Sequence, residues 1–246
     1  MSTSAYPVQR RRRGPLRAVI ITLIVLLAVL VVADRAVAYV AASKIAGQLQ
    51  SRLGTSAEPQ VSIAGFPLLT QAVAGTYERV QITATGVDAK ELDKVDVRLD
   101  LREVRLPLSD ALAGDVSHGR VGRADVAIDI SEASLSTLTG LPITIDGLTD
   151  QVARLSTTFD VFGQKVPVSI DAMVIIEGTN ARLDLQDASA AGIDLPGFVL
   201  SQLSDMVGVK FAVPTLVEGM HLDEVTARDG AVVLHASGTD VPFPKS

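Results

Sequence analysis

Residues 95–101 read VDVRLDL, in which an aliphatic residue alternates with Asp or Arg at every step. Successive side chains of a β-strand point to opposite faces of a sheet, so this period predicts a strand with one apolar and one polar face. The same alternation recurs in residues 80–84 and 124–130, and in much of the chain between Val61 and Val241. We therefore expect a large antiparallel sheet with one apolar face.

Neighbouring strands can be tested against each other, because the apolar faces of the two arms of a hairpin must coincide. Three hairpins meet this condition, and together they predict an antiparallel meander over at least residues 155–185 and a C-terminal hairpin. The predicted pairs are Val161 with Val166, Ile176 with Ala181 and Ala227 with Val232, across turns at 163–164, 177–180 and 229–230.

The alternation changes phase after Leu101, since the next aliphatic residues are Val104 and Leu106. One extra residue in a strand has this effect, so we expect a β-bulge near Arg102-Glu103. A bulge there bends a long strand, as a curved sheet requires. Short helices are expected between strands at 109–113, 131–138 (with Ser131 as N-cap) and 198–207.

An uncharged apolar segment, residues 18–33, follows five arginines near the N-terminus. As a helix it spans roughly 24 Å, a little less than the ~30 Å hydrocarbon core of a bilayer. The arginines orient the N-terminus to the cytoplasm and the remainder outward. Two outcomes stay open: a retained signal anchor, or a signal peptide cleaved after Ala36-Val37-Ala38. The predicted parts are a cytoplasmic basic N-terminus (1–17), a membrane segment (18–33) and an extracytoplasmic domain (34–246).

A second helix is expected over residues 34–53, where apolar residues recur at helical spacing and Gly54 provides a stop. Asp34 is a plausible N-cap, which predicts a slight break between this helix and the membrane segment. The residues expected to pack against the sheet are Val37, Ala41, Ile45, Leu49 and Leu53.

Composition excludes several classes of function. The chain has no cysteine, so disulfides, thiolate catalysis and Cys-ligated metals are ruled out. Its 22 basic residues include the five N-terminal arginines, which leaves 17 basic against 28 acidic residues from Ala18 onward. An acidic body without a basic patch argues against a nucleic-acid partner.

Catalytic motifs are missing from the sequence. The three histidines include His221 and His235, which the predicted hairpin places on opposite faces, so a shared metal is not expected. The carboxylate pairs Asp96/Asp100 and Asp125/Asp129 have the spacing of a possible glycosidase site, but they alternate with apolar residues and are interpreted as a solvated outer face. We therefore predict no enzyme activity, no metal and no cofactor.

The most distinctive local run is Gly65-Phe66-Pro67-Leu68-Leu69-Thr70, followed by Gly75-x-Tyr77. Pro67 ends strand pairing, so an apolar turn follows the strand. Two interpretations remain: a structural corner, or a lip that faces lipid.

These residues resemble the lipomannan-elongation-factor-like phospholipid-binding proteins of actinobacteria, and the likeness runs over about residues 34–242. The resemblance implies a cell-envelope protein that binds phospholipid, related to proteins of mannan-lipid (lipoglycan) maturation. It also implies a tubular-lipid-binding-like fold and offers no catalytic residue. Its later motifs are Phe211-x-Val213-Pro214, Leu222-x-x-Val225, Asp229-Gly230, Val233 and Ala236-x-Gly238-Thr239-Asp240-Val241.

The expected fold is α+β, with a long N-terminal helix packed in a highly curved antiparallel sheet and short helices at its edges. The expected function is non-enzymatic binding or transfer of phospholipid or glycolipid outside the cytoplasmic membrane. The rivals are an envelope scaffold with a fully packed core and a glycolipid-modifying enzyme. The residues expected to line an apolar groove are Ile45, Leu49, Phe66, Leu68, Val95, Val97, Leu99, Leu101, Val126, Ile128, Ile130, Phe159, Val199 and Leu203.

Overall fold

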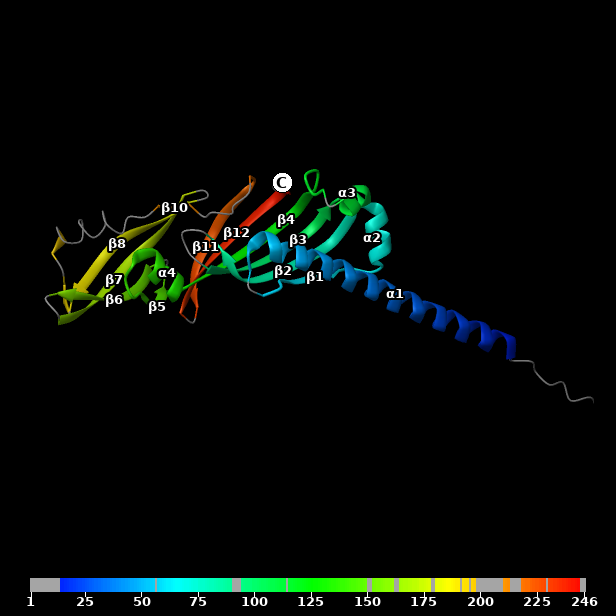
Figure 1. The fold of residues 1–246 in the computed structure, drawn as a ribbon, viewed down its shortest axis with the longest axis horizontal. Helices are drawn as coiled ribbons and strands as arrows, with labels where there is room; N and C mark the ends of the chain where they lie inside the picture. Colours follow the sequence, from blue (N-terminus) through cyan, green and yellow to red (C-terminus); the bar gives the residue numbers. More distant parts are fainter. Residues whose placement is uncertain are drawn as a thin grey trace, which may run out of the picture.

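The computed structural model confirms the α+β class, with one long helix, three short helices and two antiparallel sheets among the described residues (Figure 1). It describes residues 14–55, 57–89, 94–113, 115–149, 152–161, 164–177, 180–190, 192–194, 196–197, 210–212, 218–228 and 230–243. The helix expected at 198–207 lies outside these residues.

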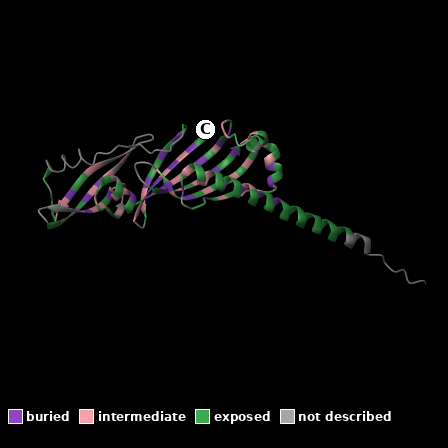
Figure 2. Cartoon of the chain, viewed as in Figure 1, coloured by how far each residue is buried: buried purple, intermediate pink, exposed green. Residues whose placement is uncertain are grey.

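The helix α1 (Gly14–Leu53) runs without interruption through both predicted helical segments. The predicted break at Asp34 is therefore wrong, because the Asp34 side chain bonds to another part of the chain and does not cap its own helix. The N-terminal half of α1 projects from the fold, and its residues from Val19 to Ala33 are exposed (Figure 2). By length and mean hydropathy, 2.6 in its most apolar window, this helix could cross a membrane.

The C-terminal half of α1 packs through a stripe of small residues, Ala38, Ala42 and Ala46. Val37 and Ile45, which were expected on the packing face, are exposed instead, so the face is turned around the helix axis. Alanine lets a helix backbone approach a strand closely, and α1 contacts β1 (Gln60–Ala64) here. At the end of the helix, Leu53 packs against the core of the first sheet.

The first sheet contains six antiparallel strands in the order β1-β2-β3-β4-β12-β11. Their apolar sides form a core cluster, and we call this side the inner face. The remaining strands of this sheet are β2 (Thr76–Asp88), β3 (Lys94–Arg105), β4 (Arg120–Ser131), β11 (Met220–Arg228) and β12 (Ala231–Pro242).

The β-bulge predicted near Arg102-Glu103 is wrong, because β3 keeps one register with both β2 and β4 through these residues and the irregular pairing of β2 with β3 lies between Ala84 and Val87. The change of phase itself is present, and it comes from a backbone distortion without an inserted residue. Leu101 and Val104 are both buried although they are three residues apart, and Glu103 between them has φ 52°. Asp240 on β12 also has φ 52°. On β4, between these two strands, a Cβ on Gly122 would lie 2.8 Å from the Glu103 Cβ, so only glycine fits.

The second sheet has the order β10-β8-β7-β6-β5, with β9 paired to β8. It meets the first sheet at β11, which contacts β5 and β7, and Ala153 of β6 belongs to the core of the first sheet. Its strands are β5 (Thr144–Thr149), β6 (Val152–Val161), β7 (Gln164–Glu177), β8 (Asn180–Ala190), β9 (Ile193–Asp194) and β10 (Lys210–Ala212).

The hairpin registers agree with the sequence in two of three cases. The predicted pairs Ile176 with Ala181 and Ala227 with Val232 are confirmed. In the first hairpin Val161 pairs with Gln164 instead of Val166, so the register is shifted by two residues. A shift of two leaves each side chain on its face, and the apolar pattern therefore cannot detect it.

The short helices lie at strand ends. The helices α2 (Leu68–Ala74) and α3 (Leu108–Ala113) contact each other near the place where α1 leaves the fold (Figure 1). The predicted N-cap of α4 (Glu132–Thr139) is confirmed, since the Ser134 amide donates to the Ser131 hydroxyl at 3.2 Å.

Candidate functional site

The inner face of the first sheet carries a row of aliphatic side chains that the rest of the protein covers incompletely. Val61, Ile82, Leu99 and Val126 pair in sequence across β1, β2, β3 and β4. All four are only half-buried, although Leu99 and Val126 stand on central strands. We call these four residues the apolar strip.

The rows on either side of the apolar strip are more tightly packed. Ala84 and Ile128 are buried in one neighbouring row, and Leu101 and Ala124 in the other. A chain of methylene groups laid along the strip would therefore contact apolar surface on both sides. The neighbouring rows also contain half-buried residues, Val97 on one side and Val80 on the other, but the strip contains no fully buried side chain on β1 to β4.

The structure brings seven of the predicted lining residues together on the inner face. Four of them belong to the buried core, and three pack against it with partial exposure. Only these three of the seven leave apolar surface that a ligand could contact. The buried residues are Val95, Leu101, Ile128 and Ile130, and the half-buried ones are Val97, Leu99 and Val126.

The other predicted lining residues lie elsewhere. Leu49 is half-buried on α1 and Ile45 is exposed there, while Leu68 is buried in α2 and Phe66 is exposed before it. The backbone of Phe159 lies in β6, but its side chain, like Val199 and Leu203, is outside the described residues. Val61 and Ile82 are not among the predicted lining residues, because their half-buried state depends on their cross-strand neighbours.

The outer face of the first sheet is a lattice of ion pairs. Arg79 Nε donates to Asp100 Oδ1 at 2.8 Å, and Asp129 accepts from Arg98 and Arg228 at 2.6 and 2.9 Å. The hydrogen bond from Arg79 outweighs partial burial and lowers the pKa of Asp100. A glycosidase acid needs a raised pKa, so this arrangement argues against a carboxylate acid at Asp100.

The two C-terminal histidines share the outer face, and the predicted placement on opposite faces is wrong. The β11–β12 register shifts between Leu222 and Glu224, so one extra residue reverses the phase. His221 Nε2 lies 3.1 Å from Asp223 Oδ1, whereas His235 Nε2 lies 3.1 Å from the Thr226 hydroxyl. Within the described part of the chain, no group of three ligating side chains could hold a metal ion.

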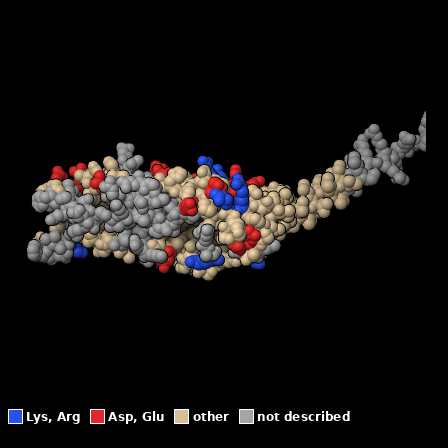
Figure 3. Space-filling view, turned by 90° about the horizontal axis from the view of Figure 1, so that it is seen from above, with Lys and Arg blue, Asp and Glu red and all other residues tan. Residues whose placement is uncertain are grey.

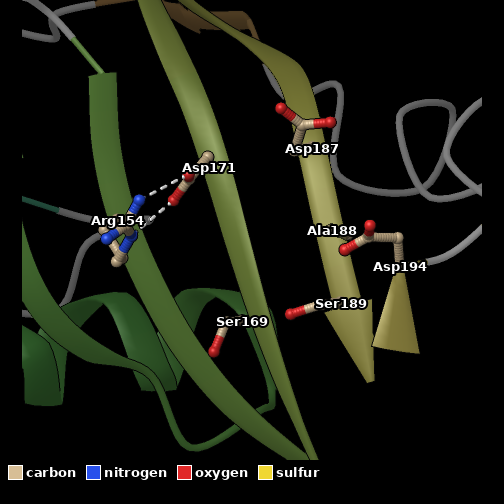
Figure 4. A pocket seen from close by; sticks show the side chains of 7 residues that line it. All are labelled: Arg154, Ser169, Asp171, Asp187, Ala188, Ser189 and Asp194. Atoms are coloured by element: carbon tan, nitrogen blue, oxygen red, sulfur yellow. Dashed lines mark hydrogen bonds and ion pairs between the residues drawn. The ribbon is translucent and has the colours of Figure 1, made fainter. Parts of the chain in front are cut away.

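An open pocket of about 510 Å³ lies on the second sheet (Figure 4). Arg154 donates to the Asp171 carboxylate at 2.8 and 2.7 Å across it. Ile170, which lies between the pocket residues Ser169 and Asp171 in β7, is buried on the opposite face of the strand. The pocket therefore lies on the polar face of the second sheet and does not suit acyl chains. Its lining residues are Arg154, Ser169, Asp171, Asp187, Ala188, Ser189 and Asp194.

A buried carboxylate joins α1 to the corner that follows β1. Asp34 is 1% exposed and accepts the amide hydrogens of Leu68 and Leu69 at 2.6 and 3.3 Å. Arg35 donates to Asp34 at 2.7 Å and to the Gly65 carbonyl at 2.6 Å, and its guanidinium lies 5.7 Å from the centre of the Phe66 ring. The Phe66-Pro67 peptide bond within this corner is cis.

Replacing Asp34 by Asn should lower the melting temperature at neutral pH. Burial raises the pKa of Asp34, but hydrogen bonds from Arg35 and from the Leu69 and Leu68 amides outweigh it and hold the pKa below its usual value. A carboxyl with a lowered pKa stabilises the fold above its unfolded pKa of about 3.9 and loses this contribution as pH falls through its folded pKa. The difference between wild type and Asp34→Asn should therefore shrink below about pH 3.9.

Thermal unfolding of the detergent-solubilised proteins, from neutral pH to below about pH 3.9, measures the difference in melting temperature between wild type and Asp34→Asn. Asp194→Asn on exposed β9 is the control, and we expect it to melt with the wild type at every pH. A difference for Asp34→Asn that stays constant into strong acid would contradict a role for the ionised carboxylate.

The incompletely covered apolar strip is a surface that suits an apolar ligand. A family model described as LmeA-like phospholipid-binding matches residues 32–237, and the class is therefore that of phospholipid-binding proteins. The chain belongs to this LmeA-like family, which confirms the predicted resemblance. The comparisons with curated proteins and with solved structures gave no match.

Proposed function

We propose that this protein binds phospholipid or glycolipid without chemical conversion, at the outer side of the cytoplasmic membrane, and serves lipid transfer or maintenance of the cell envelope. The acyl chains lie along the apolar strip formed by Val61, Ile82, Leu99 and Val126. The observation that carries the proposal is the half-buried state of these four paired side chains in a member of a phospholipid-binding family.

The energetics of the strip support acyl chains as the ligand. Each methylene removed from water contributes about 0.8 kcal/mol, so about ten methylenes buried along the strip would contribute the roughly 8 kcal/mol of micromolar binding. The strip runs across four strands, and strands lie about 4.8 Å apart, which gives a path of roughly 14 Å. That length suits part of an acyl chain.

The corner supports a retained anchor over cleavage near Ala38. Cleavage there would remove Asp34 and Arg35, which hold the Gly65 carbonyl and the Leu68 amide. Ala38 itself is buried within α1. We therefore propose a single-pass protein with residues 1–17 in the cytoplasm, 18–33 in the membrane and the domain from 34 to 246 outside. Residues 19–33 contain no charged residue, and the coloured part of the projecting helix in Figure 3 shows none.

A scaffolding role is the second candidate, because four predicted lining residues are already buried in the core. Val95, Leu101, Ile128 and Ile130 contact protein and leave no space for a ligand at their positions. In this alternative the apolar strip is only a thinly covered part of an ordinary core.

Lipid extraction separates these functions. Purified full-length protein, extracted with organic solvent and examined by mass spectrometry, should release phospholipid or glycolipid in stoichiometric amount. A fusion of residues 1–33 to an unrelated soluble domain, purified in the same detergent, gives the amount retained by the membrane segment alone. Equal lipid content in the two proteins would favour the scaffold.

A further inference from the structure

The helix α2 turns an apolar face away from the protein. Leu68 and Gln71 are buried against the fold, whereas Leu69 and Val73, one helical turn apart, are 48% and 80% exposed. Phe66, immediately before the helix, is also 48% exposed. Isolated exposed apolar residues are common on protein surfaces, but three on one short segment form a patch.

This patch lies beside the projecting part of α1. The amides of Leu68 and Leu69 donate to Asp34, and Asp34 directly follows the uncharged segment that ends at Ala33. The hydrogen bonds fix α2 at the level where α1 leaves the fold, at the end of the molecule opposite the second sheet (Figure 1). If α1 spans a bilayer, α2 is held at its outer surface.

The exposed apolar surface of α1 itself continues past Asp34 to the level of α2. Val37, Tyr39 and Val40 are all exposed. The helix from Ala18 to Val40 is roughly 34 Å long, compared with roughly 24 Å for residues 18–33 alone. Residues 18–33 alone fall short of the ~30 Å hydrocarbon core, so the next turns of α1 lie at the boundary between membrane and water, where tyrosine is enriched.

The two charged residues of α1 at this level, Asp34 and Arg35, are paired within the protein. Asp34 is 1% exposed and its carboxylate accepts hydrogen bonds from Arg35 and two backbone amides. Arg35 donates in addition to the Gly65 carbonyl, so both charges have partners within the protein. A paired charge costs much less than an unpaired one in an apolar environment.

We propose that an apolar collar inserts into the outer leaflet of the membrane that α1 spans. The collar brings β1, and with it the Val61 end of the apolar strip, close to the lipid surface. This inference rests on the proposed membrane anchor and deepens it, because it fixes the orientation of the sheet domain. The collar consists of Val37, Tyr39, Val40, Phe66, Leu69 and Val73.

Tryptophan quenching tests this proposal, since the chain contains no Trp. Full-length Leu69→Trp and Val73→Trp proteins are reconstituted into phosphatidylcholine–phosphatidylglycerol vesicles, with and without lipids that carry bromine near the carbonyl end or near the methyl end of an acyl chain. We expect brominated lipid to remove a large part of the emission of both. Ile193→Trp, on exposed β9 of the second sheet, is the matched control and should retain its emission.

A fourth variant, Leu26→Trp in the middle of the membrane segment, separates the collar from the anchor. If Leu26→Trp is quenched but Leu69→Trp and Val73→Trp are not, the collar is overturned and the anchor stays intact. This outcome would also indicate a protein partner or a second copy on the α2 face. Loss of quenching in all three would overturn both proposals, whereas quenching of Leu69→Trp and Val73→Trp above Ile193→Trp supports the collar in every case.

Discussion

Replacing Ile82 by Asp is expected to lower the amount of copurifying lipid at least about tenfold, because a carboxylate in the apolar strip would be desolvated by acyl chains. A penalty of only about 1.4 kcal/mol gives this factor. The neighbouring variant Thr83→Asp is the matched control. It places the same charge on the same strand, but on the exposed outer face and opposite Arg98. Its lipid content should equal that of the wild type.

Mass spectrometry of extracted lipid, normalised to protein, measures both variants. Circular dichroism and gel filtration identify the folded fraction, which is the fraction to be extracted. Val126→Phe provides a second approach without a charge, since its larger ring occupies space along the strip and should also lower lipid content. Equal lipid in Ile82→Asp and Thr83→Asp would place the binding surface elsewhere.

The sequence predicts the face of the sheet that each strand residue occupies better than it predicts the residue that lies opposite on the neighbouring strand. Strand periodicity places Val97, Leu99 and Val126 on the inner face because burial of one face imposes a period of two. The same reasoning cannot distinguish registers that differ by two residues, as in the hairpin that joins Val161 to Gln164. It also fails at a bulge, which moved His221 to the face of His235.

The candidate site could not be predicted fully from the sequence, because it depends on contacts between distant parts of the chain. Asp34 has the residue type and position of an N-cap, but its hydrogen-bond acceptors serve amides 34 and 35 residues later. Ile82 is half-buried because neighbouring elements cover it incompletely. The local sequence pattern does not predict this cover. The composition of the corner at Gly65 made it recognisable in the sequence. Its attachment to α1 through Asp34 and Arg35 became visible only in the structure.

The corner holds a glycine with a positive φ and crowded surroundings, and Gly65→Ala should destabilise the protein by about 3 kcal/mol or more. Gly65 has φ +101°, which an L-residue with a Cβ rarely adopts. A Cβ there would overlap the Gln71 side-chain amide and lie 2.7 Å from Glu78 Oε2. Gln71 is buried and accepts the Glu78 amide hydrogen at 2.9 Å, so it cannot move aside without loss of that bond.

Gly140→Ala isolates the backbone contribution to this loss. Gly140 caps α4 with φ +69°, and a Cβ there would meet no atom within 4 Å. Its cost should therefore be only the ~1 kcal/mol of a left-handed alanine. Urea unfolding of both variants in detergent gives the two free energies of unfolding, and their difference measures the overlap with Gln71 and Glu78 together with the extra backbone strain at φ +101°. A loss in Gly65→Ala no larger than in Gly140→Ala would mean that Gln71 rearranges freely and that α2 is not held rigidly against α1.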